Sequence, residues 1–156
     1  MALGFRKGII DNFRNGIIII GKFNVVKQEN DAVVATRETE AKSNSLIKKT
    51  KYIWLKNDPN LTYKQRVQKE SLCKKHLKTA RTYSIREELQ DIYSTSEIRT
   101  EVEPRMKKQR SWMMHSRLQE TKMFCGTKNH WNEYLNYFDK KYTNDALESI
   151  DISFKT

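Results

Sequence analysis

The sequence lacks the features from which membrane spans, disulfide frameworks and zinc sites are built. Its longest apolar run, Ile17 to Ile20, is far shorter than the roughly 20 residues of a transmembrane helix, so we expect a cytoplasmic protein without a membrane partner. Cys73 and Cys125 form no CxxC pair and have no histidine at ligand spacing, which argues against zinc and disulfides. Both are expected to be small thiols in the core.

Glycine and histidine supply no catalytic signal either. The five glycines form neither a GxGxxG nor a Walker loop, so a nucleotide cradle is not expected. His76, His115 and His130 fall on separate predicted helices, without a cysteine nucleophile or an acidic pair at motif spacing. Each is expected to be a surface or packing histidine.

Positive charge is what the sequence has in excess. Thirty Lys and Arg residues against nineteen Asp and Glu leave a net charge of +11 on 156 residues, enough chain for one domain. The segment from Lys42 to Arg81 holds twelve basic and two acidic residues, almost all of that charge. A helix starting near Tyr63 would bring five of them close to one face, where they could follow the phosphates of DNA. These five are Lys64, Lys74, Lys75, Lys78 and Arg81.

Two further readings of this basic segment stay open. A solvated helix face in any lysine-rich soluble protein would look the same. If these residues do bind DNA, few aromatic residues are interleaved with the five cations, namely Tyr63 and Tyr83, which favours nonspecific contact with a duplex over sequence-specific recognition of a single strand.

The N-terminal third combines one predicted strand with polar helices. Apolar spacing predicts a short helix over residues 5–14, and the β-branched run Ile17 to Ile20 predicts a strand buried on both faces. No second convincing strand follows, so its partners either precede Met1 or the segment is not a strand. Residues 26–41 have the pattern of a polar helix with a thin apolar stripe.

The middle of the chain is predicted to be helical. Residues 43–60 look like a connection in which Trp54 fills the core, and Ile85, Leu89, Ile92 and Tyr93 have the spacing of one buried stripe. Capping-box spacing and proline mark three helix starts. The pair Thr62 and Gln65 predicts a helix start near Tyr63, and the pair Ser84 and Glu87 predicts one near Ile85. Pro104 suits the first turn of a third helix. The last well-patterned helix carries Trp131, Tyr134, Leu135 and Phe138.

Glu148 is the one carboxylate that invites a catalytic interpretation. It lies on a predicted helix after a short turn, where it could act as a metal ligand or general base. A two-metal site for phosphoryl transfer, however, needs several carboxylates.

Several ordered motifs resemble those of one protein family. They are the run from Tyr52 to Thr62, Leu77-Lys78-Thr79-Ala80-Arg81, His115-Ser116-Arg117-Leu118, His130-Trp131, and Thr143-Asn144 with Glu148. In this order they resemble the transposases of the ISL-three group of bacterial insertion sequences, over nearly the whole chain. The resemblance implies a DDE domain of ribonuclease H-like fold that uses two Mg²⁺ ions for DNA transposition and recombination. It also implies a helical insertion between the second Asp and the final Glu.

The resemblance sets the expected fold and domain organisation. We expect a mainly α protein in which residues 1–45 are a remnant of the α/β ribonuclease H-like core, with one or two N-terminal strands. Residues 46–138 would be the helical insertion, and residues 139–156 the truncated start of the helix that bears the catalytic Glu. The earlier strands of the sheet, with the upstream carboxylates, are expected to be absent from this chain.

The chain also departs from the family pattern at residues 21–24. Gly21 stands where the family has Asp, and Asn24 where it has His. Only Glu148 therefore carries over as a catalytic and metal-binding position, with Thr143 and Asn144 as its motif neighbours. One carboxylate does not hold two Mg²⁺ ions, so we expect no bound cofactor in this chain and no strand cleavage.

Three hypotheses follow for the function. The first is a truncated, catalytically inactive DDE transposase. The alternative is a non-enzymatic basic helical module that binds DNA nonspecifically or associates with an intact transposase. The third is a chain that packs poorly in its N-terminal third while residues 62–138 form a helical bundle.

Overall fold

The computed structural model describes residues 19–118, 121 and 130–139, and in this part the chain is helical without a strand. This confirms the prediction of a mainly α protein, whereas the remnant of a ribonuclease H-like sheet is not confirmed. None of the described helices is both long and apolar enough to cross a membrane. The elements are α2 (Lys22–Ser43), η1 (Ser45–Ile47), α3 (Lys51–Leu55), η2 (Asp58–Asn60), α4 (Tyr63–Cys73), α5 (Lys78–Thr95), α6 (Arg99–His115) and α8 (Trp131–Asp139).

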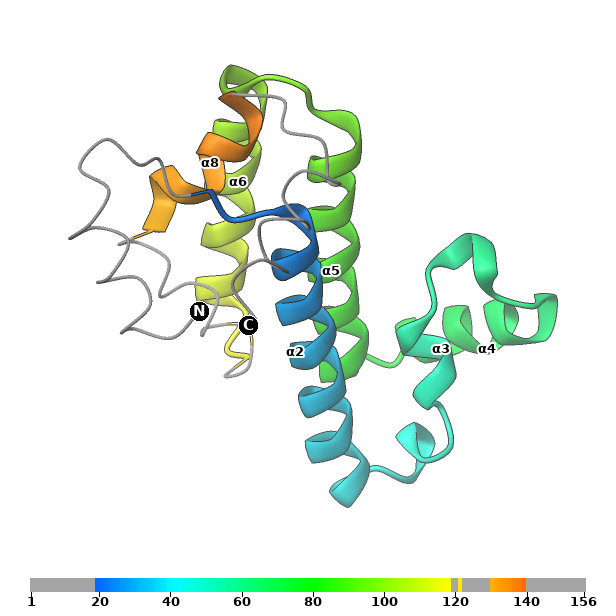
Figure 1. Ribbon diagram of the computed structural model, residues 1–156. Helices are drawn as coiled ribbons and strands as arrows, with labels where there is room; N and C mark the ends of the chain where they lie inside the picture. Colours follow the sequence, from blue (N-terminus) through cyan, green and yellow to red (C-terminus); the bar gives the residue numbers. More distant parts are fainter. Residues whose placement is uncertain (1–18, 119–120, 122–129, 140–156) are drawn as a thin grey trace, which may run out of the picture.

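The long helices α2, α5 and α6 lie side by side, and α8 packs against α6 (Figure 1). Helix α2 runs antiparallel to α5, because Lys22 Nζ donates to Ser94 Oγ at 3.2 Å near one end while Glu40 contacts Thr79 near the other. The short elements η1, α3, η2 and α4 form a lobe beside this bundle (Figure 1). We call residues 45–73 the side lobe.

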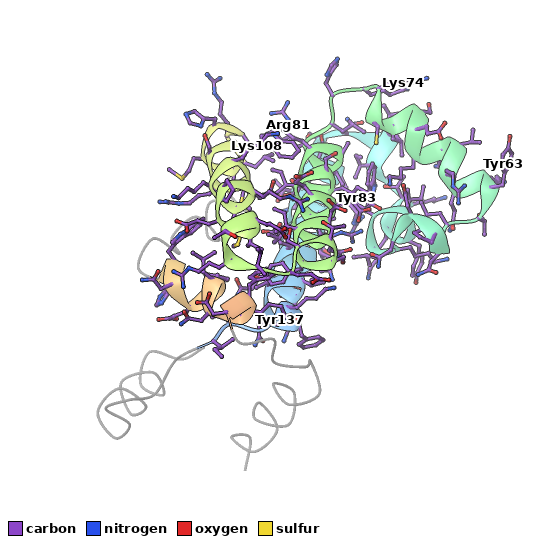
Figure 2. The ribbon with its side chains drawn as sticks, turned by 90° about the horizontal axis from the view of Figure 1, so that it is seen from above. Tyr63, Lys74, Arg81, Tyr83, Lys108 and Tyr137 are labelled. Atoms are coloured by element: carbon purple, nitrogen blue, oxygen red, sulfur yellow. The ribbon has the colours of Figure 1, made fainter. Side chains whose placement is uncertain are left out.

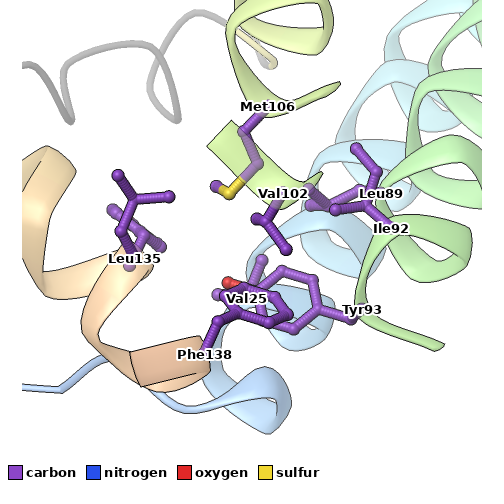
Figure 3. Close-up of a cluster of buried hydrophobic side chains, with 9 residues drawn as sticks. Val25, Leu89, Ile92, Tyr93, Val102, Met106, Leu135 and Phe138 are labelled. Atoms are coloured by element: carbon purple, nitrogen blue, oxygen red, sulfur yellow. The ribbon is translucent and has the colours of Figure 1, made fainter. Parts of the chain in front are cut away.

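The main core lies between α2, α5, α6 and α8 (Figure 3). Its buried residues are Val25, Leu89, Ile92, Tyr93, Val102, Met106, Tyr134, Leu135 and Phe138. They include most of the stripe predicted on α5 and most of the predicted apolar face of α8, whose fourth residue, Trp131, is partly buried against them. Because Val25 and Val33 of α2 are fully buried, the expectation of poor packing in the N-terminal third is wrong for residues 22–43.

Trp54 anchors the side lobe, as predicted. Its side chain is fully buried, its Nε1 donates to Thr50 Oγ1 at 3.0 Å, and its ring meets that of Tyr83 edge-on at 5.6 Å. The start of α4 is also confirmed: Gln65 N donates to Thr62 Oγ1 at 3.3 Å, and Thr62 N donates to Gln65 Oε1 at 3.1 Å. This reciprocal pair satisfies two backbone donors that a helix start leaves without partners.

The predicted strand is not confirmed. Ile19 and Ile20 belong to no regular element, while Ile17, Ile18 and the predicted helix over residues 5–14 lie outside the described residues. Since α2 begins at Lys22, the chain is helical directly after Gly21.

Two predicted helix starts are wrong. Helix α5 begins at Lys78, so Ser84 lies inside it and its Oγ donates to Ala80 O at 3.1 Å instead of capping. Helix α6 begins at Arg99, which puts Pro104 past the first turn. Pro104 and Thr100 are both exposed, so water can solvate the Thr100 carbonyl that proline leaves without a helical donor.

Glu29 is a carboxylate buried in the bundle. It is 1 % exposed, and its Oε2 has no hydrogen-bond partner among the described residues. Burial raises the pKa of Glu29 from 4.5 to about 7, although the positive charge of Arg86 opposes this rise. The folded protein therefore holds this proton more tightly than the unfolded chain does.

We expect the free energy of unfolding to fall less with rising pH in Glu29→Gln than in the natural chain. The stabilisation from the protonated carboxyl is complete below pH 4.5 and is lost as the pH rises through about 7. At about 1.4 kcal/mol per pKa unit, the loss is on the order of 3 kcal/mol. Urea unfolding of both proteins across this range measures it, and parallel pH profiles for the two proteins would contradict the prediction.

Candidate nucleic-acid interface

Three helix ends meet at one end of the bundle. Helices α5 and α6 are antiparallel, since Gln109 Nε2 donates to Ile85 O at 2.6 Å and Arg105 pairs with Asp91 at 2.6 Å. Consequently the C-terminal end of α6 lies beside the start of α5, where Arg81 Nη1 donates to Ser116 O at 3.2 Å. The end of α2 joins them through Glu40.

Glu40 of α2 caps the N-terminus of α5. Its carboxylate accepts hydrogen bonds from Lys78 N and Thr79 N, both at 2.9 Å, and from Thr79 Oγ1 at 2.7 Å. Helix α5 has no side-chain cap from its own N-cap residue, Leu77. A carboxylate satisfies the free backbone donors there and complements the positive end of the helix dipole. This contact from another helix explains why α5 starts at Lys78.

Exposed basic side chains gather around these three helix ends. We call this group the basic end. In Figure 2, Lys74 and Arg81 are labelled toward the same edge of the view. Within the described part of the chain, no residue of the basic end forms an ion pair with a carboxylate. The basic end consists of Lys42, Lys74, Lys75, Lys78, Arg81 and Arg117, all of them exposed.

A pocket of about 490 Å³ opens at the basic end. Its cations come from two elements, Lys78 at the start of α5 and Arg117 just after α6. Hydroxyl and amide groups on its wall can donate to an anion, and the carboxylate of Glu40 is already bound by α5. The lining residues are Thr36, Thr39, Glu40, Ser43, Asn44, Lys78, Arg117 and Leu118.

Four of the five predicted DNA-binding residues belong to the basic end, but for a different reason than predicted. The expected single helix face is wrong, because α4 ends at Cys73 and a turn of Lys74 to His76 separates it from α5. His76 has a positive φ of 52°, which no helix continues through. The fifth residue, Lys64, lies in the first turn of α4, away from the other four.

Arg117 is a member of the basic end that the sequence pattern did not predict. A signal for it was present, because residues 105–117 contain five basic residues and no acidic one. Two of these are neutralised in the fold, Arg105 by Asp91 and Lys107 by Glu103 at 2.9 Å. Charge counting alone does not separate such paired cations from Lys108 and Arg117.

Lys69 is a basic residue of the segment 42–81 that serves the fold. It pairs with Asp58, and its Nζ lies 4.0 Å from the centre of the Tyr83 ring. Burial alone would lower the pKa of Lys69, but its hydrogen bonds to Asp58 and Tyr83 outweigh this and raise the pKa above its ordinary value. Lys69 therefore ties α4 to η2 and α5.

Arg86 fixes the side lobe to the bundle. Its side chain is fully buried, and Nη1 donates to Asn30 Oδ1 and to Trp54 O, both at 3.0 Å. Nη2 pairs with Glu87 at 2.6 Å, and the guanidinium lies 4.4 Å from the centre of the Tyr83 ring. Arg86 thus joins α2, α3 and α5, a role that the sequence analysis did not detect.

The predicted chemistry receives no support from the described residues. Glu148, Thr143 and Asn144 lie outside them, as does Cys125. The described part contains no group of three or more His, Cys, Asp or Glu residues placed to hold a metal ion. Cys73 is exposed, so its assignment to the core is wrong.

Together these features define a helical protein with a basic end suited to a polyanion. A family model described as Transposase, for DDE transposases of the ISL-three (ISL3) group, matches residues 1–156. The chain therefore belongs to the ISL-three transposase family, which confirms the resemblance and implies an interaction with DNA. No curated protein and no solved structure matches the chain significantly.

Proposed function

We propose that this transposase-derived chain binds duplex DNA nonspecifically through its basic end. The observation that carries the proposal is the convergence of six exposed cations from α2, α5, the turn before α5 and the segment after α6. Phosphates of a duplex are spaced so that several such cations can contact one backbone. No base-reading geometry is needed for this mode of binding.

Titration of a fluorescent duplex across a salt series tests the proposed binding. Each neutralised phosphate contributes about −0.9 to the slope of log K against log salt. Four to six contacts then give a slope of roughly −4 to −5. A slope near zero, or no binding at low salt, would overturn the proposal.

We further propose that the chain does not cut DNA by itself. Two observations support this: Gly21 replaces the family Asp and Asn24 the family His, and the catalytic carboxylate expected in the chain is Glu148 alone. When one residue is removed from a catalytic set that acts as a unit, the rate of the reaction falls by several orders of magnitude.

We expect supercoiled DNA to remain intact when the chain is incubated with it and Mg²⁺. Gel analysis of nicked and linear products measures this, with Glu148→Ala as the matched protein. Nicking by the natural chain that disappears in Glu148→Ala would show that the proposal is wrong. Association with an intact transposase stays a prediction, which mixing the two proteins in the same assay would test.

A further inference from the structure

Two tyrosines of the side lobe are exposed. Tyr63, the first residue of α4, is 84 % exposed, and Tyr52, in the first turn of α3, is 67 % exposed. Tyr83, which was grouped with Tyr63 from the sequence, is instead buried: its side chain is only 2 % exposed and packs against Trp54 and Lys69. Within the side lobe, the aromatic residues available to a partner are therefore Tyr52 and Tyr63, an arrangement that the sequence did not reveal.

The side lobe holds these rings away from the bundle. Figure 1 shows α3 and α4 projecting to one side of α5, and Figure 2 places Tyr63 at the outer edge of the molecule. Helices α3 and α4 contact each other, and the buried contacts of Trp54 with Arg86 and Tyr83 fix α3 to the bundle. Both rings are thus carried on a fixed support.

Unpaired cations accompany the two rings. Lys51 precedes Tyr52 and Lys64 follows Tyr63, and three more exposed basic residues lie on the same short elements or next to them. Among the described residues none of the five pairs with a carboxylate. The other three are Lys48, Lys49 and Arg66.

We propose that the side lobe binds single-stranded DNA, with Tyr52 and Tyr63 stacking on unpaired bases while the lysines around them contact the phosphates. Every base has a π-face, so this mode tolerates any sequence, and a rigid aromatic ring next to a cation is the usual element of such surfaces. In a duplex the bases are stacked on one another and do not offer these faces. The proposal rests on the proposed DNA binding but uses a surface separate from the basic end.

The test compares three forms of the full chain on a fluorescent oligothymidylate and on a duplex. The double variant Tyr52→Ala and Tyr63→Ala should bind the single strand at least roughly 30-fold more weakly, because each of the two stacked bases contributes about 1–3 kcal/mol. The matched variant Tyr52→Phe and Tyr63→Phe keeps both rings and should bind like the natural chain. Duplex affinity should change less than about twofold in either variant, since phosphate contacts supply it.

Each remaining outcome decides the question. Equal single-strand affinity in the alanine variant and the natural chain, or no single-strand binding by the natural chain, would overturn the stacking role. Self-association in sedimentation that the alanine variant abolishes would assign the two rings to a contact with a second copy instead. If the natural chain binds duplex in these cases, only the side-lobe inference fails, whereas absence of all DNA binding would remove the proposed function itself. Circular dichroism confirms that the exposed substitutions leave the helices intact.

Discussion

Replacing both Lys74 and Lys78 by alanine is expected to lower the affinity for duplex DNA roughly 50-fold at about 0.1 M salt. Each phosphate contact releases counterions worth about 0.9 log units at that salt, and two such contacts are lost. The slope of log K against log salt should become shallower by about 1.8. Neither lysine side chain makes an ion pair in the described structure, so the fold should be preserved.

The matched control removes the same charge elsewhere. Lys27 is exposed on α2, and Lys107 on α6 forms only a surface pair with Glu103, which contributes little to stability. The double variant Lys27→Ala and Lys107→Ala should keep most of the duplex affinity. If both double variants lose affinity equally, net charge and not the basic end governs binding, and the proposed interface is wrong.

Arg86→Ala is expected to lower the free energy of unfolding by about 3–5 kcal/mol. The substitution leaves the partly buried acceptor Asn30 Oδ1 and the buried acceptor Trp54 O without this donor, and it removes the cation that faces Glu29. Urea unfolding followed by circular dichroism measures the loss. Because Arg86 joins the side lobe to α2 and α5, Trp54 fluorescence should report loosening of the lobe as well.

Arg66→Ala serves as the control for this prediction. Arg66 is an exposed arginine of α4 without an ion pair among the described residues, so its removal should change stability by no more than about 0.5 kcal/mol. A loss for Arg86→Ala as small as that for Arg66→Ala would show that the buried contacts of Arg86 do not support the fold.

Local signals in the sequence predicted local structure well. The capping box of Thr62 and Gln65 acts within one helical turn, and the start of α4 follows it. The stripe of Leu89 and Ile92 has helical spacing on any straight helix, and both residues are buried as expected. Ser84 and Glu87 have the same local spacing as a cap but lie inside α5, because Glu40 supplies the cap at Lys78 instead.

The candidate DNA surface was only partly predictable, because it too depends on contacts between helices that are distant in sequence. The charge count of residues 42–81 is a property of the chain, and Lys74, Lys75, Lys78 and Arg81 follow from it. That Lys69 pairs with Asp58 while Arg117 joins Lys78 at one pocket depends on helices that are distant in sequence. Likewise, Tyr52 is exposed and Tyr83 is buried, a difference that depends on packing against Trp54 and Lys69.

By itself, the sequence determined the helical class, the excess of positive charge and, through its ordered motifs, membership in a transposase family. These depend on residue types and on spacings within a few turns, which every conformation of the chain shares. The tertiary structure decided which cations remain unpaired, where α5 begins and which tyrosines face solvent. Those outcomes depend on contacts such as Glu40 with Thr79 and Arg86 with Trp54, which exist only after α2, α3 and α5 have packed together.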